Sequence, residues 1–243
     1  MFISKHRRLS ECRGGGVQYI PGHIEPFVDL VVNNYLPRTG SILEIGGAGL
    51  RFAVPVAARG RQITVVDLDS SGLDVRSIVD RVNQNGDGDL QVDELCERID
   101  TRVQSAAGFL HSPPARYTMI AAFRLAHFSS PHDFKRLFDL VQLALEPGGV
   151  FVISAMTPFN LPEMHDYNEV YLSTEPVRKS SPLYRAFRQD PEAQRVRRLQ
   201  NLTPRVHFVS SELIGEHATT EGFELVVDAF ASTRIVAGFV LRK

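Results

Sequence analysis

The sequence has little of what disulfide-stapled or membrane-spanning proteins require. Among its 243 residues only Cys12 and Cys96 are cysteines, and two thiols cannot staple a framework of loops. No apolar run reaches the roughly 18 residues of a membrane-spanning helix. Residues 1–16 also lack the apolar stretch of a secretory signal. Together these absences predict a protein of the reducing cytoplasm.

Neither sign of charge is in excess, because 27 Lys and Arg face 28 Asp and Glu for a net charge of −1. Such a chain has no global attraction for nucleic acid. Charge is nevertheless segregated along the chain. The charged residues of 67–100 are mostly acidic, and those of 178–205 are mostly basic. Both segments could be solvated surfaces, or the basic one could cover an acidic substrate.

Apolar runs alternate with amphipathic stretches from residue 41 onward, which is typical of an α/β fold. Strands are expected at 41–46, 62–69, 101–106, 117–123, 150–156, 223–231 and 234–243, and helices at 51–60, 71–82, 132–145 and 210–222. This order predicts a doubly wound, seven-stranded, mostly parallel sheet. Only a few residues join the last two strands, so the final strand should be antiparallel.

Two segments fall outside this pattern. Residues 1–40 precede the first strand, and residues 157–206 follow the fifth. Ligands of a doubly wound sheet bind beyond the carboxyl ends of its strands. We therefore expect an N-terminal lid at 1–40 and a domain at 41–243 that carries a cap at 157–206.

The run LEIGGAGLRFAVPVAARGRQITVVDLD, residues 43–69, predicts a nucleotide half-site. Its first strand carries Glu44 and is followed by Gly46, Gly47 and Gly49, which allow a sharp turn and close approach of a ligand. Its second strand ends in Asp67, where an acid can accept the hydroxyl hydrogens of a ribose. The alternative is a tight strand–helix turn without a ligand.

At these residues the sequence resembles the class I S-adenosylmethionine (SAM)-dependent methyltransferases. LEIGGAG resembles the first motif of that family and VVDLD its ribose-binding strand. The segments YTMIAAFRLAHF, LALEPGGVFVIS and EGFELV are similar to its later strand motifs. The sequence departs from the family at Ala48 and Leu50, where glycines are usual, and at Ala106 and Thr118, where acids are usual.

The resemblance implies which residues contact each part of SAM. Along the methionine part it implies Glu44, Gly46, Gly47 and Phe123; at the ribose, Asp67; around the adenine, Leu68, Ala106 and Ala107. Tyr19, in the N-terminal lid, could close over the cofactor; the alternative is that YIPGH is simply a turn.

Catalytic residues leave a weaker trace, because methyl transfer mainly requires alignment of two reactants and exclusion of water. A base is needed only for an amine or phenol nucleophile of high pKa. Polar residues after the fourth and fifth strands are the candidates: His127, Asn160, His165, Tyr167 and Tyr171. Each could instead be a hydrogen-bonded structural residue.

Residues 83–94, NQNGDGDLQVDE, are similar to an EF-hand loop. The calcium ligands would be Asn83, Asn85, Asp87, Asp89 and Glu94. Asparagine at the first position, where aspartate is usual, predicts weak binding. A polar turn without metal is the alternative.

The preferred hypothesis is a SAM-dependent methyltransferase acting on a small molecule, because 157–206 is rich in aromatic and arginine residues. RNA is the competing acceptor. A second hypothesis is an enzyme that cyclises SAM and releases methylthioadenosine. A third is a calcium-responsive binding protein on a methyltransferase scaffold. The acceptor atom and the oligomeric state stay open.

Overall fold

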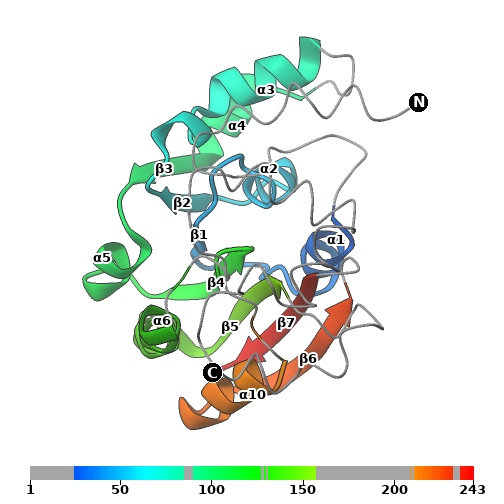
Figure 1. Ribbon diagram of the computed structural model, residues 1–243. Coiled ribbons are helices and arrows are strands. Elements are labelled where there is room, and N and C mark those ends of the chain that lie inside the picture. The colour runs from blue at the N-terminus through cyan, green and yellow to red at the C-terminus, as the bar shows by residue number, and fades with distance from the viewer. Residues whose placement is uncertain are drawn as a thin grey trace, which may run out of the picture. The chain divides into compact units, whose positions relative to one another are not determined.

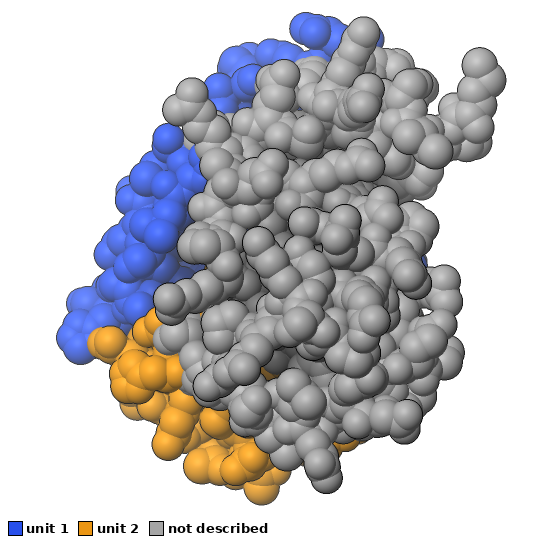
Figure 2. Space-filling model, viewed as in Figure 1, with its two compact units in different colours: residues 1–121 blue, residues 122–243 orange. Residues whose placement is uncertain are grey.

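A computed structural model describes residues 25–84, 90–126, 129, 131–156, 209, 211–231 and 236–243. The chain forms two compact units, residues 1–121 and 122–243, which Figure 2 colours separately. The predicted cap at 157–206 and the first part of the predicted N-terminal lid lie outside the described residues.

The first unit contains α1 to α5 and β1 to β3 (Figure 1). Its helices are α1 (Pro26–Asn34), α2 (Ala53–Ala58), α3 (Val75–Gln84), α4 (Val92–Arg98) and α5 (Ala106–His111); its strands are β1 (Ile42–Ile45), β2 (Ile63–Asp67) and β3 (Ile99–Val103). Strand β4 (Tyr117–Phe123) crosses the boundary at residue 121. The second unit contains α6 (Pro131–Ala144), β5 (Leu145–Met156), α10 (Ser211–Thr220), β6 (Glu224–Ala231) and β7 (Val236–Arg242).

The strands form one seven-stranded sheet in the order β3-β2-β1-β4-β5-β7-β6. Strand β1 pairs in parallel with β2 and β4, and β2 pairs in parallel with β3. Strand β7 is antiparallel to both β5 and β6. The predicted α/β class, the seven strands and the antiparallel last strand are confirmed.

The central strands are apolar because they are covered by helices. All four residues of β1 are buried. Helix α2 buries five of its six residues, and α2 and α4 pack on β2 and β3. Helix α2 tolerates Pro55 because that residue lies in its first turn, and the chain leaves the helix at Gly60, whose φ is +76°. None of the described helices is long and apolar enough to cross a membrane.

Two strands begin earlier in the structure than predicted. The third strand occupies Ile99–Val103 rather than 101–106, because the Ser105 side chain accepts a hydrogen bond from the Gly108 N–H and starts α5 at Ala106. The fifth strand begins at Leu145 rather than at residue 150, since Gly148 and Gly149 exchange backbone hydrogen bonds with Lys243.

Candidate functional site

A tight turn follows β1 and places the glycine run against β2. Gly46 and Gly49 have φ of +69° and +93°, in the left-handed region that glycine enters readily. The Gly46 N–H donates to the Val66 carbonyl and the Gly49 N–H to the Gly72 carbonyl, at 2.8 Å each. Leu50 also has a positive φ, +57°, which costs about 1–2 kcal/mol outside glycine. The buried Leu50 side chain offsets that cost through its contacts.

Glu44 lies beneath this turn and is only 2% exposed. Its Oε2 accepts a hydrogen bond of 3.1 Å from the Ala53 N–H at the start of α2. Burial raises the pKa of the Glu44 carboxyl to about 8, the Ala53 N–H opposes that shift, and the negative charge of Asp67 adds to it. The positive charge of Arg51 also opposes the rise, but with a pKa of about 8 the Glu44 carboxyl is mostly neutral at pH 7 in the protein without ligand.

Asp67, at the end of β2, ties that strand to the glycine turn. Its Oδ2 accepts from the Ala48 N–H at 2.9 Å, and its Oδ1 accepts from the Asp69 N–H at 2.8 Å. A carboxylate oxygen can accept two hydrogen bonds, so these contacts orient Asp67 and leave it capacity to bind hydroxyl groups. Leu68 follows it and is 73% exposed.

The structure brings together the predicted residues of β1, β2 and the turn between them: Glu44, Gly46, Gly47, Asp67 and Leu68. Ala106 and Ala107 lie in the first turn of α5. Phe123 ends β4, is buried, and belongs to the second unit. The remaining predicted residues, Tyr19, His127, Asn160, His165, Tyr167 and Tyr171, lie outside the described residues.

One feature of this region was not predicted from the sequence. Arg51, directly after the turn, forms an ion pair with Glu25, which precedes α1, at 3.2 Å from Nη1 to Oε2. The side chains are 20% and 3% exposed. In the sequence, Glu25 and Arg51 are each visible only as a charged residue beside an apolar stretch, and this pattern does not show that they pair with each other.

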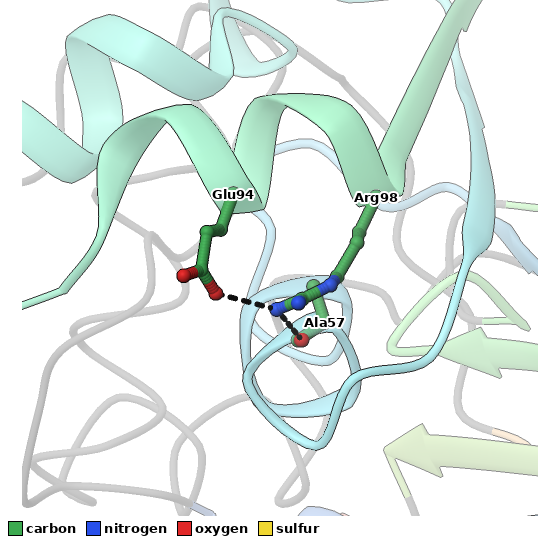
Figure 3. A network of polar contacts seen from close by, with 3 residues as sticks. All are labelled: Ala57, Glu94 and Arg98. Atoms are coloured by element: carbon green, nitrogen blue, oxygen red, sulfur yellow. Dashed lines mark hydrogen bonds and ion pairs between the residues drawn. The ribbon is translucent and has the colours of Figure 1, made fainter.

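The described ends of the EF-hand-like loop do not support a calcium site. The Asn83 side chain exchanges two hydrogen bonds with the Leu90 backbone, at 2.8 and 3.0 Å. The Glu94 carboxylate pairs with Arg98 at 3.0 Å, and the same guanidinium donates to the Ala57 carbonyl (Figure 3). Asn85, Asp87 and Asp89 lie outside the described residues. Within the described ranges no three His, Cys, Asp or Glu side chains gather as a metal site.

We expect melting curves of the wild type recorded in millimolar calcium and in chelator to coincide. The variant Glu94→Gln should lose only the half-exposed pair with Arg98, which is worth about 0.5 kcal/mol or less. A rise in melting temperature that requires both calcium and Glu94 would contradict this interpretation.

The ionisation of Glu44 gives a further prediction, for the protein without ligand. The unfolded chain releases this proton near pH 4.5 and the native state near pH 8, so between these values the native state binds more protons. Native stability from this group therefore falls as pH rises, by at most about 1.4 kcal/mol per pH unit. Denaturant unfolding of wild type and Glu44→Gln across this window should show the fall only in the wild type. If the unfolding free energies of the wild type and Glu44→Gln changed with pH in the same way, the raised pKa of the buried Glu44 carboxyl would be contradicted.

The chain is similar to known proteins in its fold but not in its sequence. No model of a known protein family matches this sequence, and no curated protein matches it. Solved structures do match. An O-methyltransferase family protein from Burkholderia thailandensis aligns with a TM-score of 0.58 and 12% identity over 90% of this chain and 55% of that one.

The glycopeptide N-methyltransferase MtfA in complex with SAM aligns with a TM-score of 0.56 and 15% identity over 93% of this chain and 96% of that one. The fold is that of the class I methyltransferases. Magnesium protoporphyrin IX methyltransferase (ChlM) from Synechocystis, with bound S-adenosylhomocysteine (SAH), shares it with a TM-score of 0.54 and 12% identity over 100% of this chain and 87% of that one. The chain spans about half the length of the Burkholderia protein.

Proposed function

We propose that the chain is a SAM-dependent methyltransferase that acts on a small-molecule acceptor. The observation that carries this proposal is the presence of an acid near the carboxyl end of each of two neighbouring parallel strands. Asp67 is oriented by backbone N–H groups of the glycine turn, and Glu44 is buried beneath that turn.

The donor set fits SAM. Asp67 can accept hydrogen bonds from the two ribose hydroxyls, and the exposed Leu68 side chain offers an apolar surface to the adenine. Glu44 is a buried acid that a ligand ammonium would neutralise. Gly47 leaves room for this carboxyl, because a Cβ at residue 47 would lie 2.8 Å from the Glu44 Cδ. Ala106 and Ala107, at the start of α5, would border the adenine, and Phe123 the methionine part.

When bound, SAM supplies a methyl group on a positively charged sulfur, which a nucleophile displaces in line. The chain's own part is to hold the cofactor, align the acceptor and exclude water. A base is required only for an acceptor of high pKa. For that role His127, Asn160, His165, Tyr167 and Tyr171 stay predictions, as do Tyr19, the N-terminal lid and the cap at 157–206.

A small molecule is the proposed acceptor because the cap sequence combines aromatic and arginine side chains. The names of two structural neighbours support a small-molecule acceptor: one is a glycopeptide N-methyltransferase and the other a magnesium protoporphyrin IX methyltransferase. RNA stays the competing acceptor, and the cytoplasmic location stays a prediction. Calcium has no part in the proposed function.

The test is mass spectrometry after incubation of the purified protein with SAM and an extract of small molecules. The proposal predicts SAH together with a product that is heavier by one methylene. The variant Asp67→Ala should form both more slowly at limiting SAM. Methylthioadenosine from SAM alone would support the cyclising alternative, and unchanged SAM in every extract would contradict both.

A further inference from the structure

The ion pair between Glu25 and Arg51 joins the start of α1 to the residue that follows the glycine turn. Both side chains are largely withdrawn from water, which makes this pair unlike the more exposed pairs of α3, α4 and β3. Removing two charges from water costs free energy, which the attraction between the charges and further contacts of the pair have to offset. Its position beside the proposed cofactor site suggests a role in binding.

The charge of Arg51 acts on the proposed site directly. Arg51 lies two residues before Ala53, whose N–H donates to the Glu44 Oε2 at 3.1 Å, and its positive charge opposes the rise in the pKa of Glu44. The other charge that acts on Glu44 is the negative charge of Asp67. Arg51 is therefore the positive member of a group that otherwise consists of Glu25, Glu44 and Asp67.

The amino-acid end of SAM carries an ammonium and a carboxylate on the same carbon atom. If Glu44 receives the ammonium, the carboxylate has to lie beside it, in an environment already crowded with acids. A guanidinium presents several N–H donors in a planar arrangement that suits a carboxylate. Among the described residues whose charges act on Glu44, only Arg51 supplies that chemistry.

We propose that Arg51 binds the carboxylate of the cofactor's amino-acid end and that Glu25 competes with this carboxylate for the guanidinium. The inference rests on the proposed use of SAM. In the structure Glu25 neutralises Arg51, and binding shifts Arg51 toward the ligand carboxylate. Glu25 therefore lowers the affinity for SAM, while Arg51 raises it.

The experiment is calorimetric titration with two probes, SAM and decarboxylated SAM, which differ by the carboxylate alone. The wild type should prefer SAM. Arg51→Gln should weaken SAM binding by about 10-fold or more and leave decarboxylated SAM unchanged. Glu25→Gln should tighten SAM by about 3- to 10-fold and leave decarboxylated SAM unchanged. Arg51→Lys, which keeps the charge, should retain part of the preference.

The exposed Arg76, which pairs with Asp93, provides the matched control, and Arg76→Gln should change neither affinity. Equal weakening of both probes by Arg51→Gln, or weaker SAM binding in Glu25→Gln, would overturn the inference, because the pair would then serve only the fold. A wild type that binds neither probe would overturn the proposed function as well. Melting curves of each variant confirm that the comparison concerns folded protein.

Discussion

Asp67→Ala is expected to weaken SAM binding by about 1.5–3 kcal/mol, or roughly 10- to 150-fold. The substitution removes both carboxylate oxygens that the ribose hydroxyls would use. It also removes the acceptor for the Ala48 and Asp69 N–H groups, so the glycine turn loses an anchor. Calorimetric titration of wild type and variant measures the effect.

Asp67→Asn is the milder variant, because the amide oxygen keeps one of the two acceptors for the turn while the charge and the other acceptor are lost. It should be less destabilised than Asp67→Ala and still bind SAM more weakly than the wild type. Asp93→Ala is the control: Asp93 is an exposed acid of α4 that pairs with Arg76, and its loss should leave SAM affinity unchanged. Unchanged affinity in Asp67→Ala would exclude Asp67 as the ribose ligand.

Gly47→Ala is expected to reduce SAM affinity by at least about 10-fold and to destabilise the protein by about 1–3 kcal/mol. A Cβ at this position would lie 2.6 Å from the Val65 Cγ1 and 2.8 Å from the Glu44 Cγ and Cδ. Both neighbours are buried, so neither can move without disturbing the core. The glycine is needed here for space above the Glu44 carboxyl.

Gly215→Ala is the matched control for Gly47→Ala. Gly215 lies inside α10, where an added Cβ meets no atom within 4 Å. Alanine there should stabilise the protein by about 0.5–1 kcal/mol, because it favours the helix, and should leave SAM affinity unchanged. Denaturant unfolding and SAM titration of both variants make the comparison. If Gly47→Ala kept the affinity and stability of the wild type, residue 47 would not lie close enough to Glu44 and Val65 to require glycine.

The strands that could be predicted from the sequence are those with apolar runs. Residues 41–46, 62–69 and 117–123 predicted β1, β2 and β4 closely, because most residues of these strands are buried and apolar. Strand β3 was placed two residues late. It lies at the edge of the sheet, where only Ile99 is buried and an Asp100–Arg102 ion pair occupies the exposed positions. An edge strand gives no continuous apolar signal.

The sequence predicted the acids of the candidate site, because an acid at the end of a predicted strand can be recognised from the sequence alone. Glu44 and Asp67 follow that rule, and the structure places them within electrostatic reach of each other. The positive φ of Leu50 was not predictable, because leucine gives no local reason for it; surrounding packing imposes the conformation. The Glu25–Arg51 pair was missed because its members belong to different elements, which only the tertiary fold brings together.

The most direct test of the central claim is a crystal structure of the full chain with SAH at saturating concentration. We expect the ribose hydroxyls to donate to the Asp67 carboxylate, the adenine to lie against Leu68 and the amino group to lie at Glu44. SAH bound away from the glycine turn, or no SAH in a crystal whose lattice leaves that turn accessible, would contradict the assignment of this edge of the sheet as the cofactor site.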